Sequence, residues 1–228
     1  MPGSLTVVPE RASLTQKIAR RLRQGPYTYS SRFGLRRTLA VPVDPPKAKI
    51  PLSIRPFQPG DAEALFGHRD EVADPADALE VHYRLKHLKA DIPTPYVAID
   101  ETTGRPCYLQ WLMGAEQNDK IQANLWGFPR LDKDVALLEN AYIPPAYRGQ
   151  RIMSEAMYMV SERGRDLGAN YALTFVAGDN LPSLKGCKRA GFDIYLFNER
   201  SIYAFGLFER HSFSVIPVGD ARLTLLDN

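Results

Sequence analysis

The stretch Pro144-Pro145-Ala146-Tyr147-Arg148-Gly149-Gln150-Arg151-Ile152-Met153 decides how the rest of this chain is interpreted. It joins an apolar, β-prone run over residues 136–143 to a segment with helical periodicity over 150–167. The first turn of a helix leaves several N–H groups without partners, and the helix dipole adds partial positive charge there. Gly149 allows close approach to the backbone, and the two arginines add full charges. The stretch therefore predicts a strand, a turn and a helix that bind a pyrophosphate.

A second informative stretch lies one predicted strand further along the chain, Asn180-Leu181-Pro182-Ser183-Leu184-Lys185-Gly186-Cys187-Lys188-Arg189-Ala190-Gly191-Phe192. Together the two stretches resemble the GNAT family of acyl-CoA N-acyltransferases. The resemblance is specific in order and spacing over residues 136–192 and looser from Leu52 onward, and it does not include the first 50 residues. It implies a GNAT fold, in which helices flank a central, mostly antiparallel twisted sheet with splayed middle strands.

The other patterns predict an α+β, mixed α/β fold, because strands and helices alternate along the chain. β-Prone runs predict strands at 52–57, 96–100, 106–113, 171–176, 194–197, 201–206 and 211–216. Helices are predicted at 62–68, from Asp74-Pro75 to about Leu88, and at 183–189. The polar segment 114–133 carries Trp126 and Phe128, which either fold over a cleft or cap a core. We expect this segment and the early helices to build the acceptor site.

Charge is distributed unevenly along the 228 residues, whose net charge is +3. The first 50 residues hold ten basic and two acidic residues, a net charge of +8, which leaves −5 for the remainder. Ser13 with Gln16 resembles a capping box at the start of a short basic amphipathic helix. Four prolines within 41–51 then favour an extended linker. We therefore predict a basic arm and Pro-rich linker over 1–50 and a GNAT-like acyltransferase domain over 51–228.

The basic arm has two open interpretations. Such a helix can bind an anionic membrane surface or an acidic carrier protein, or it can be a solvated leader. Nucleic acid is not expected as a partner, since no basic platform with interleaved aromatic residues follows. No stretch approaches the ~20 apolar residues of a membrane span, and the N-terminus lacks the apolar core of a secretory signal. The expected location is cytoplasmic, peripheral to a membrane if the arm binds one.

The cysteines and histidines predict no metal site. Cys107 and Cys187 are too few and too far apart for a disulfide framework or a zinc site, so reduced thiols are expected. Among the four histidines, His82 and His87 are five residues apart, which differs from the four-residue spacing of helical metal ligands. The only cofactor that we expect is acetyl-CoA, or another acyl-CoA, as a co-substrate.

The resemblance implies a set of CoA-binding residues. The family pattern Arg/Gln-x-x-Gly-x-Gly/Ala falls on residues 148–153, where Arg151 replaces a usual Gly and Met153 a usual Gly or Ala. The family binds pyrophosphate largely through backbone N–H groups, and the exposed strand edge before the turn pairs with the pantetheine arm. Asn180 is expected to hydrogen-bond near the same arm, and it can at the same time be the N-cap of its helix. The implied set is Ala141, Tyr142, Ile143, Arg148, Gly149, Gln150, Arg151, Ile152, Met153, Asn180 and Ser183.

Acylation of an amine needs a base for the amine and an acid for the leaving thiolate. Many GNAT enzymes place a tyrosine seven residues after the Asn, where this chain has Cys187. Cys187 is either the acid, a covalent nucleophile, or a buried thiol. Glu139 precedes Ala141 by two residues, so we expect it on the same strand face, either as a base acting through water or as a surface carboxylate. Other candidate acids are Tyr142, Tyr147, Tyr158, Tyr195 and Tyr203.

These observations predict an enzyme that moves an acyl group, most simply acetyl, from CoA to a primary amine of a small molecule or amino sugar. Two alternatives stay open. One is an inactive GNAT-like module that senses acyl-CoA, and the other is a long-chain acyltransferase that uses acyl-CoA or acyl carrier protein. The sequence leaves a homodimer open and does not indicate the acceptor.

Overall fold

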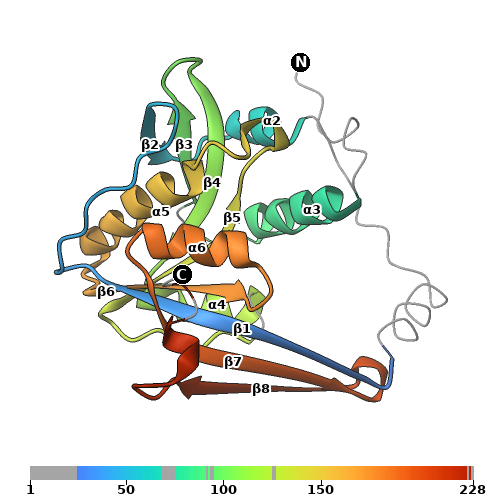
Figure 1. The fold of residues 1–228 in the computed structure, drawn as a ribbon. Coiled ribbons are helices and arrows are strands. Elements are labelled where there is room, and N and C mark those ends of the chain that lie inside the picture. Colours follow the sequence, from blue (N-terminus) through green and yellow to red (C-terminus); the bar gives the residue numbers. More distant parts are fainter. Residues whose placement is uncertain are drawn as a thin grey trace.

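One eight-stranded sheet runs through the molecule in the order β2-β3-β4-β5-β6-β1-β7-β8 (Figure 1). The structure is a computed structural model that describes residues 25–67, 75–90, 92, 95–124, 127–224 and 226. The predicted basic helix that begins near Ser13 and the side chain of Trp126 lie outside these residues. The strands are β1 (Tyr27–Thr38), β2 (Leu52–Pro56), β3 (Pro95–Asp100), β4 (Arg105–Met113), β5 (Val135–Tyr142), β6 (Tyr171–Ala177), β7 (Asp193–Tyr203) and β8 (Phe208–Val215).

The pairing of these strands confirms a mostly antiparallel sheet. Only β5 and β6 pair in parallel, and every other neighbouring pair in the sheet is antiparallel. The α-helices are α2 (Asp61–Phe66), α3 (Pro75–Lys89), α4 (Asn118–Asn124), α5 (Ile152–Glu162) and α6 (Leu181–Arg189). Short 3-10 turns include η3 (Pro145–Tyr147) before α5 and η4 (Arg163–Leu167) after it. The result is the expected mixed α+β architecture.

The helices cover both faces of the sheet, because alternate residues of each strand point to opposite sides. Leu112 of β4 packs in a core cluster with residues of α5 and α6. Its neighbours Trp111 and Met113 pack in a second cluster with residues of α2, α3 and α4. Figure 1 shows α5 and α6 side by side over one face, with α3 set apart from them. The sheet therefore lies between two helical layers, and β4 contributes to both cores.

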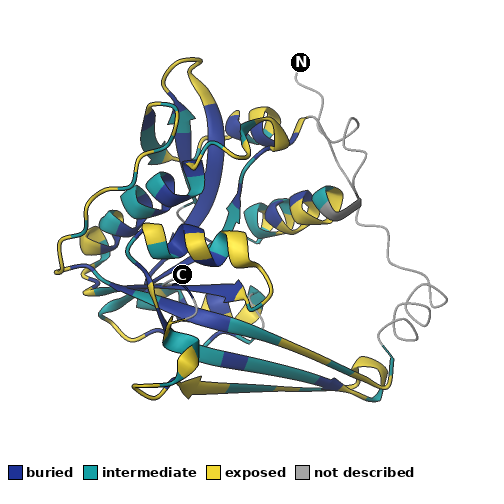
Figure 2. Cartoon of the chain, in the orientation of Figure 1, coloured by how far each residue is buried: buried dark blue, intermediate teal, exposed yellow. Residues whose placement is uncertain are grey.

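Strand β1 corrects the predicted domain boundary. We expected the folded region to begin near Leu52, but β1 pairs along its length with β7 and, over residues 32–38, with β6. Phe33 and Leu35 are buried in the core on the α5 side. Figure 2 shows the end of β1 near Tyr27 more exposed than its centre, and Tyr27 itself is 53% exposed. The high content of basic residues concealed a strand whose apolar residues alternate.

The basic residues of β1 are accommodated by contacts that the sequence does not display. Arg37 is only 2% exposed, and its guanidinium donates to Ser161 Oγ at 2.5 Å and forms an ion pair with Glu162. The same guanidinium lies 4.2 Å from the ring centroid of Tyr158. A buried cation is tolerated when its charge and its N–H groups find such partners. Part of the charge assigned to an arm therefore belongs to the core.

Candidate cofactor and acyl-transfer site

A gap opens in the middle of the sheet where β5 and β6 separate. The two strands pair only from Val135↔Tyr171 to Leu137↔Leu173, although β5 continues to Tyr142 and β6 to Ala177. The side chain of Glu139 bridges the start of this gap, since its Oε1 accepts a hydrogen bond from the Phe175 N–H at 3.1 Å. The splayed middle strands that the resemblance implied are therefore present.

A β-bulge in β5 redirects the side chains at the gap. Leu109 of β4 pairs with Tyr142 and Trp111 pairs with Glu139, so two steps along β4 correspond to three along β5. The extra residue lies at Asn140, whose φ of 62° is in the left-handed region. A bulge of this kind bends the strand and re-aims the residues that follow it.

The bulge makes one prediction wrong. We expected Glu139 and Ala141 to share a face, as residues two apart do in a regular strand. Ala141 instead packs against the cluster that contains Ile152 of α5, while Tyr142 packs with Leu137 on the other face. Residues 137 and 142 share a face only because the bulge adds one residue between them.

A cavity of about 730 Å³ occupies the gap and extends between α3 and α6. Its lining includes the predicted site residues Glu139, Ala141, Tyr142, Ile143, Arg148, Met153, Asn180, Ser183 and Cys187. The lining also includes Phe128 and, from the early helix α3, Asp77, Glu80, Tyr83, Arg84 and His87, in the two regions where we expected the acceptor site. Phe128 both borders the cavity and packs in the second core cluster. The sequence did not indicate Arg32 of β1 or Tyr108 and Gln110 of β4, which line the cavity as well.

The predicted pyrophosphate turn has an open backbone. Gly149 has φ 77°, and a Cβ at this position would meet no atom within 4 Å, so the turn is open to solvent. Arg151, the N-cap residue of α5, has φ 61° and makes no side-chain capping hydrogen bond. The carbonyl of Gln150 is already occupied by the Lys49 N–H at 2.9 Å. The N–H groups of the first turn of α5 are thus left without a side-chain cap.

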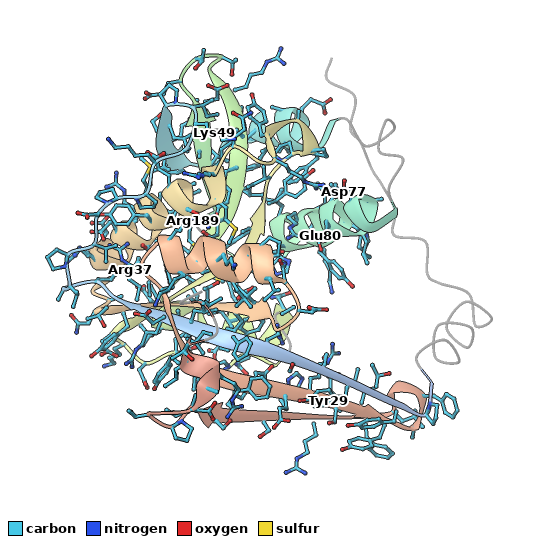
Figure 3. All side chains as sticks on the ribbon, viewed as in Figure 1. Tyr29, Arg37, Lys49, Asp77, Glu80 and Arg189 are labelled. Atoms are coloured by element: carbon cyan, nitrogen blue, oxygen red, sulfur yellow. The ribbon has the colours of Figure 1, made fainter. Side chains whose placement is uncertain are left out.

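Arg148 does not stand beside this turn as an unpaired charge. Its Nη2 lies 2.6 Å from Oδ1 of Asp77, and its Nη1 donates to Oδ2 of Asp77 at 3.1 Å. Asp77 belongs to α3, as Figure 3 shows, so the bidentate pair connects the turn to the helix on the other side of the cavity. The pair holds the rim of the cavity together and neutralises much of the charge that we had expected to act on a phosphate.

The N-terminal end of α6 closes the cavity from the other side. Asn180 is its N-cap, with Oδ1 accepting the Ser183 N–H at 3.1 Å, so the structural alternative for this residue is realised. Met153 of α5 packs on Gly186 of α6, where an added Cβ would come 3.2 Å from the Met153 sulfur. Met153 therefore fills space between the two helices rather than lying across the open turn at Gly149.

Glu139 has the electrostatic environment of a base. Burial of the carboxylate raises its pKa from 4.5 to about 7, and the positive charge of Arg32 is the largest influence in the opposite direction. A proton acceptor works best when its pKa is near the operating pH. The carboxylate of Glu139 can hence gain or lose a proton near neutral pH.

Cys187 has the environment of a structural thiol. The residue is fully buried, its Sγ–H donates to the Met157 sulfur at 3.7 Å, and burial raises its pKa from 9.0 to about 12. The nucleophilic form of cysteine is the thiolate, which is scarce at neutral pH in such a site. These contacts favour the buried-thiol interpretation over the covalent one.

A tyrosine that the sequence did not single out lies beside this cysteine. Tyr108 of β4 is fully buried, borders the cavity, and donates its hydroxyl proton to Gln110 Oε1 at 2.6 Å. Burial raises its pKa, and Cys187 contributes to the same shift. The five tyrosines that we had considered are placed differently: only Tyr142 lines the cavity, and the other four, Tyr147, Tyr158, Tyr195 and Tyr203, do not.

Helix α3 presents several polar groups to the cavity. Arg84 forms an ion pair with Glu80 one turn earlier and donates to the Ala141 carbonyl at 2.7 Å, which anchors the helix to the bulged strand. His87 bonds through Nδ1 to the Tyr83 carbonyl at 2.9 Å, and its buried Nε2 has no hydrogen-bond partner among the residues that the structure describes. Burial lowers the pKa of His87, so its imidazole is neutral at pH 7.

The described residues contain no group of three or more His, Cys, Asp or Glu side chains placed to hold a metal ion. In the same part of the chain, no helix combines the length and the apolar character needed to cross a membrane.

Strands that splay around a carboxylate, next to a helix N-terminus without a side-chain cap, form a candidate cofactor site. Residues 77–192 match the family model described as "Acetyltransferase (GNAT) family". The chain belongs to the GNAT family of acetyltransferases, whose members use acyl-CoA. No curated protein matches it.

Several solved structures are similar to this chain. A fungal GCN5-related glucosamine N-acetyltransferase region, part of a multi-domain GH3 β-N-acetylglucosaminidase, is 13% identical with a TM-score of 0.51, over 84% of this chain and 23% of that one. A GCN5-related N-acetyltransferase from Sphaerobacter thermophilus is 16% identical with a TM-score of 0.45, over 85% of this chain and 58% of that one. A Drosophila protein is 15% identical with a TM-score of 0.47, over 79% and 52% of the two chains. The chain thus spans little more than half of the last two relatives.

Proposed function

We propose that this protein transfers an acyl group, acetyl in the simplest case, from CoA to a primary amine of a small molecule. The observation that carries the proposal is Glu139, a partly buried residue between the splayed strands whose carboxylate has a pKa of about 7. In the proposed reaction Glu139 accepts a proton from the amine, directly or through water. The amine nitrogen attacks the thioester carbonyl, the C–S bond breaks, and the CoA thiolate takes up a proton.

The cofactor is proposed to lie along the first turn of α5 and the edge of β5. The N–H groups after Gly149 would bind the pyrophosphate. The edge of β5 that no longer pairs with β6 after Leu137, and the residues that follow it to Ile143, would pair with the pantetheine arm as a peptide adds to a sheet. At Ala141 the carbonyl is already bonded to Arg84, so this pairing would use other backbone groups. Asn180 and Ser183, which line the same cavity, would bound the arm on the α6 side. This arrangement aims the thioester into the gap that holds Glu139.

For the acid we propose Tyr108 in place of Cys187. Tyr108 stays protonated because of its raised pKa, and it borders the cavity beside the position where many relatives carry a tyrosine. Its proton is directed at Gln110 Oε1, so a rotation of the hydroxyl would be enough to redirect it toward a thiolate. In this proposal the proton donor for the thiolate comes from β4, whereas the family pattern would place it on α6.

The direct test is release of free CoA thiol from acetyl-CoA in the presence of a panel of primary amines. We expect release that depends on both the amine and the enzyme. A parallel series with long-chain acyl-CoA and acyl carrier protein donors identifies the acyl length. Tight binding of acetyl-CoA without thiol release on any amine or donor would contradict the proposal and support the sensor alternative.

The variant Cys187→Ala tests the role of the thiol. We expect kcat to stay within about threefold of the natural protein, because a thiol with a pKa of about 12 offers little thiolate to a thioester. The free energy of unfolding should fall by about 1 kcal/mol, since the substitution leaves a small void among well-packed neighbours. Thiol release and urea unfolding measure the two effects. A loss of more than 100-fold in kcat with acetyl-CoA binding intact would restore Cys187 as a catalytic residue.

A further inference from the structure

Arg32 brings a positive charge from the N-terminal strand into the cavity. Its backbone lies between Ala177 of β6 and Asn198 of β7, in the middle of the sheet. Its guanidinium carbon lies 5.0 Å from the ring centroid of Phe128, which also lines the cavity. The contact with the aromatic face holds the guanidinium at the cavity wall and leaves its N–H edge free to bind.

This guanidinium differs from the other arginines of the cavity because its charge is not matched by an ion pair. Arg148 is paired with Asp77, and Arg84 with Glu80. For Arg32, no hydrogen bond or ion pair to any residue in the described part of the chain is found, although burial disfavours its charged form. An arginine remains protonated in proteins and carries five N–H donors. A partly buried guanidinium without an anionic partner is a site prepared for a carboxylate or a phosphate.

The nearest acidic groups do not fill this role. In β8, Oε1 of Glu209 accepts from Arg200 at 2.5 Å and lies 2.6 Å from Nε2 of His211, so this carboxylate already has a cation of its own in Arg200. Glu139 influences Arg32 through its charge, but its recorded hydrogen bond is to the Phe175 N–H. The cavity therefore presents one carboxylate suited to an amine and one guanidinium suited to an anion.

We propose that the acceptor carries an anionic group, a carboxylate or a phosphate, near its primary amine, and that Arg32 binds this group while the amine meets Glu139. The inference rests on the proposed function and narrows its substrate class. An amine without the anionic group would cover the Arg32 guanidinium without supplying a counter-charge, and burying a charge without a partner costs free energy.

Matched pairs of amines test the inference. Each pair has one member with an anionic group and one without: amino acids against their amides, and amino sugars against their phosphates. Binding to the CoA-loaded protein is measured by calorimetry, and thiol release from acetyl-CoA is measured in the same samples. We expect at least one pair in which the anionic member is favoured about tenfold or more. The carboxylate and phosphate arms show which anion is used.

Variants of Arg32 assign the preference to this side chain. In the Arg32→Gln variant, the anionic and the neutral member of each pair should bind and react about equally. Arg32→Lys should retain part of the preference for the anionic member, because lysine keeps the charge but lacks the planar guanidinium. The matched control is Arg36→Gln, four residues along the same face of β1, where the guanidinium stacks on Tyr171 and Tyr195 outside the cavity. The Arg36→Gln variant should favour the anionic amines as strongly as the natural protein does. Thermal melting and acetyl-CoA affinity confirm that each variant is folded.

Two results would overturn the inference: no anionic member is favoured in any pair, or Arg32→Gln keeps the full preference. The measurements separate this failure from failure of the proposed function. Anionic amines that bind through Arg32 without thiol release would contradict acyl transfer only. Thiol release on neutral amines that is unaffected by Arg32→Gln would contradict the anion site only.

Discussion

The Glu139→Gln variant should lose about 100-fold or more in kcat for acyl transfer, because it keeps the shape of the side chain and removes its ability to accept a proton. The Phe175 N–H that now bonds to Glu139 Oε1 at 3.1 Å can bond to the amide oxygen instead, so the gap between β5 and β6 should be preserved. The affinity for acetyl-CoA should therefore change little. Thiol release under saturating acetyl-CoA measures the first effect, and calorimetry the second.

The pH profile gives an independent readout of the same group. Because the pKa of Glu139 is about 7, kcat/KM of the natural protein should rise with pH through about 7, as the carboxylate ionises. The Glu139→Gln variant should lack this step. Glu116→Gln, at an exposed position outside the cavity, is the control and should keep the natural profile. A full-activity Glu139→Gln variant would remove Glu139 as the base and direct attention to the unpartnered Nε2 of His87.

The same substitution should make the protein more stable above neutral pH. The pKa of Glu139 in the folded state, about 7, lies above its ordinary value of 4.5, so the folded protein binds the proton more tightly than the unfolded chain. The contribution of this tighter proton binding to the free energy of unfolding is complete below about pH 4.5 and is lost as the pH rises through about 7. At pH 8 the Glu139→Gln variant should therefore gain up to roughly 3 kcal/mol in the free energy of unfolding. Urea unfolding at pH 5 and pH 8 separates a functional carboxylate from a structural one, whose loss would destabilise at both.

The second large effect is expected at the pyrophosphate turn. Gly149→Asp should raise KM for acetyl-CoA by about 100-fold, because it places a carboxylate where the phosphates are proposed to bind and adds a side chain at φ 77°. The space around the new Cβ is open, with no atom within 4 Å, so the fold itself should persist. The measurement is KM from initial rates, with a direct titration of CoA.

Gly168→Asp is a closely matched control for this variant. Gly168 has the same φ of 77° and the same absence of neighbours around an added Cβ, but it follows η4, beyond the opposite end of α5. The two variants should lose similar stability from backbone strain, and only Gly149→Asp should lose CoA affinity. Equal KM values for both would mean that the pyrophosphate does not bind at this turn.

The position of the turn and of α6 could be predicted because both are encoded by neighbouring residues. A glycine with positive φ, an N-cap asparagine and the periodicity of a helix act over one or two turns of chain. These features located Gly149 before α5 and Asn180 before α6. The strand before the turn was predicted at 136–143 and lies at Val135–Tyr142.

Other features of the site could not be predicted from the sequence, because they depend on contacts between residues far apart in the chain. The bulge at Asn140 depends on how β5 pairs with β4, so the relative orientation of Glu139 and Ala141 was predicted wrongly. Strand β1 was not predicted because its sequence is rich in basic residues. The hydrogen-bond partner of Arg37, Ser161, and its ion-pair partner, Glu162, lie more than 120 residues away in the sequence. Tyr108 gave no signal because a strand that is apolar almost throughout, as β4 is, looks the same in sequence whether it borders a cavity or a core.

By itself, the sequence determined the family, the mixed α+β class and the turn that opens at Gly149, because these depend on backbone conformation and on the order of motifs along the chain. Only the tertiary structure decided which charges act in the cavity. The ion pair with Asp77 neutralises much of the charge of Arg148. Burial raises the pKa of Glu139 to about 7. Arg32 is brought to the cavity by β1, a strand from the N-terminal region. Electrostatic strength depends on desolvation and on distance in space, and neither is visible in the order of residues.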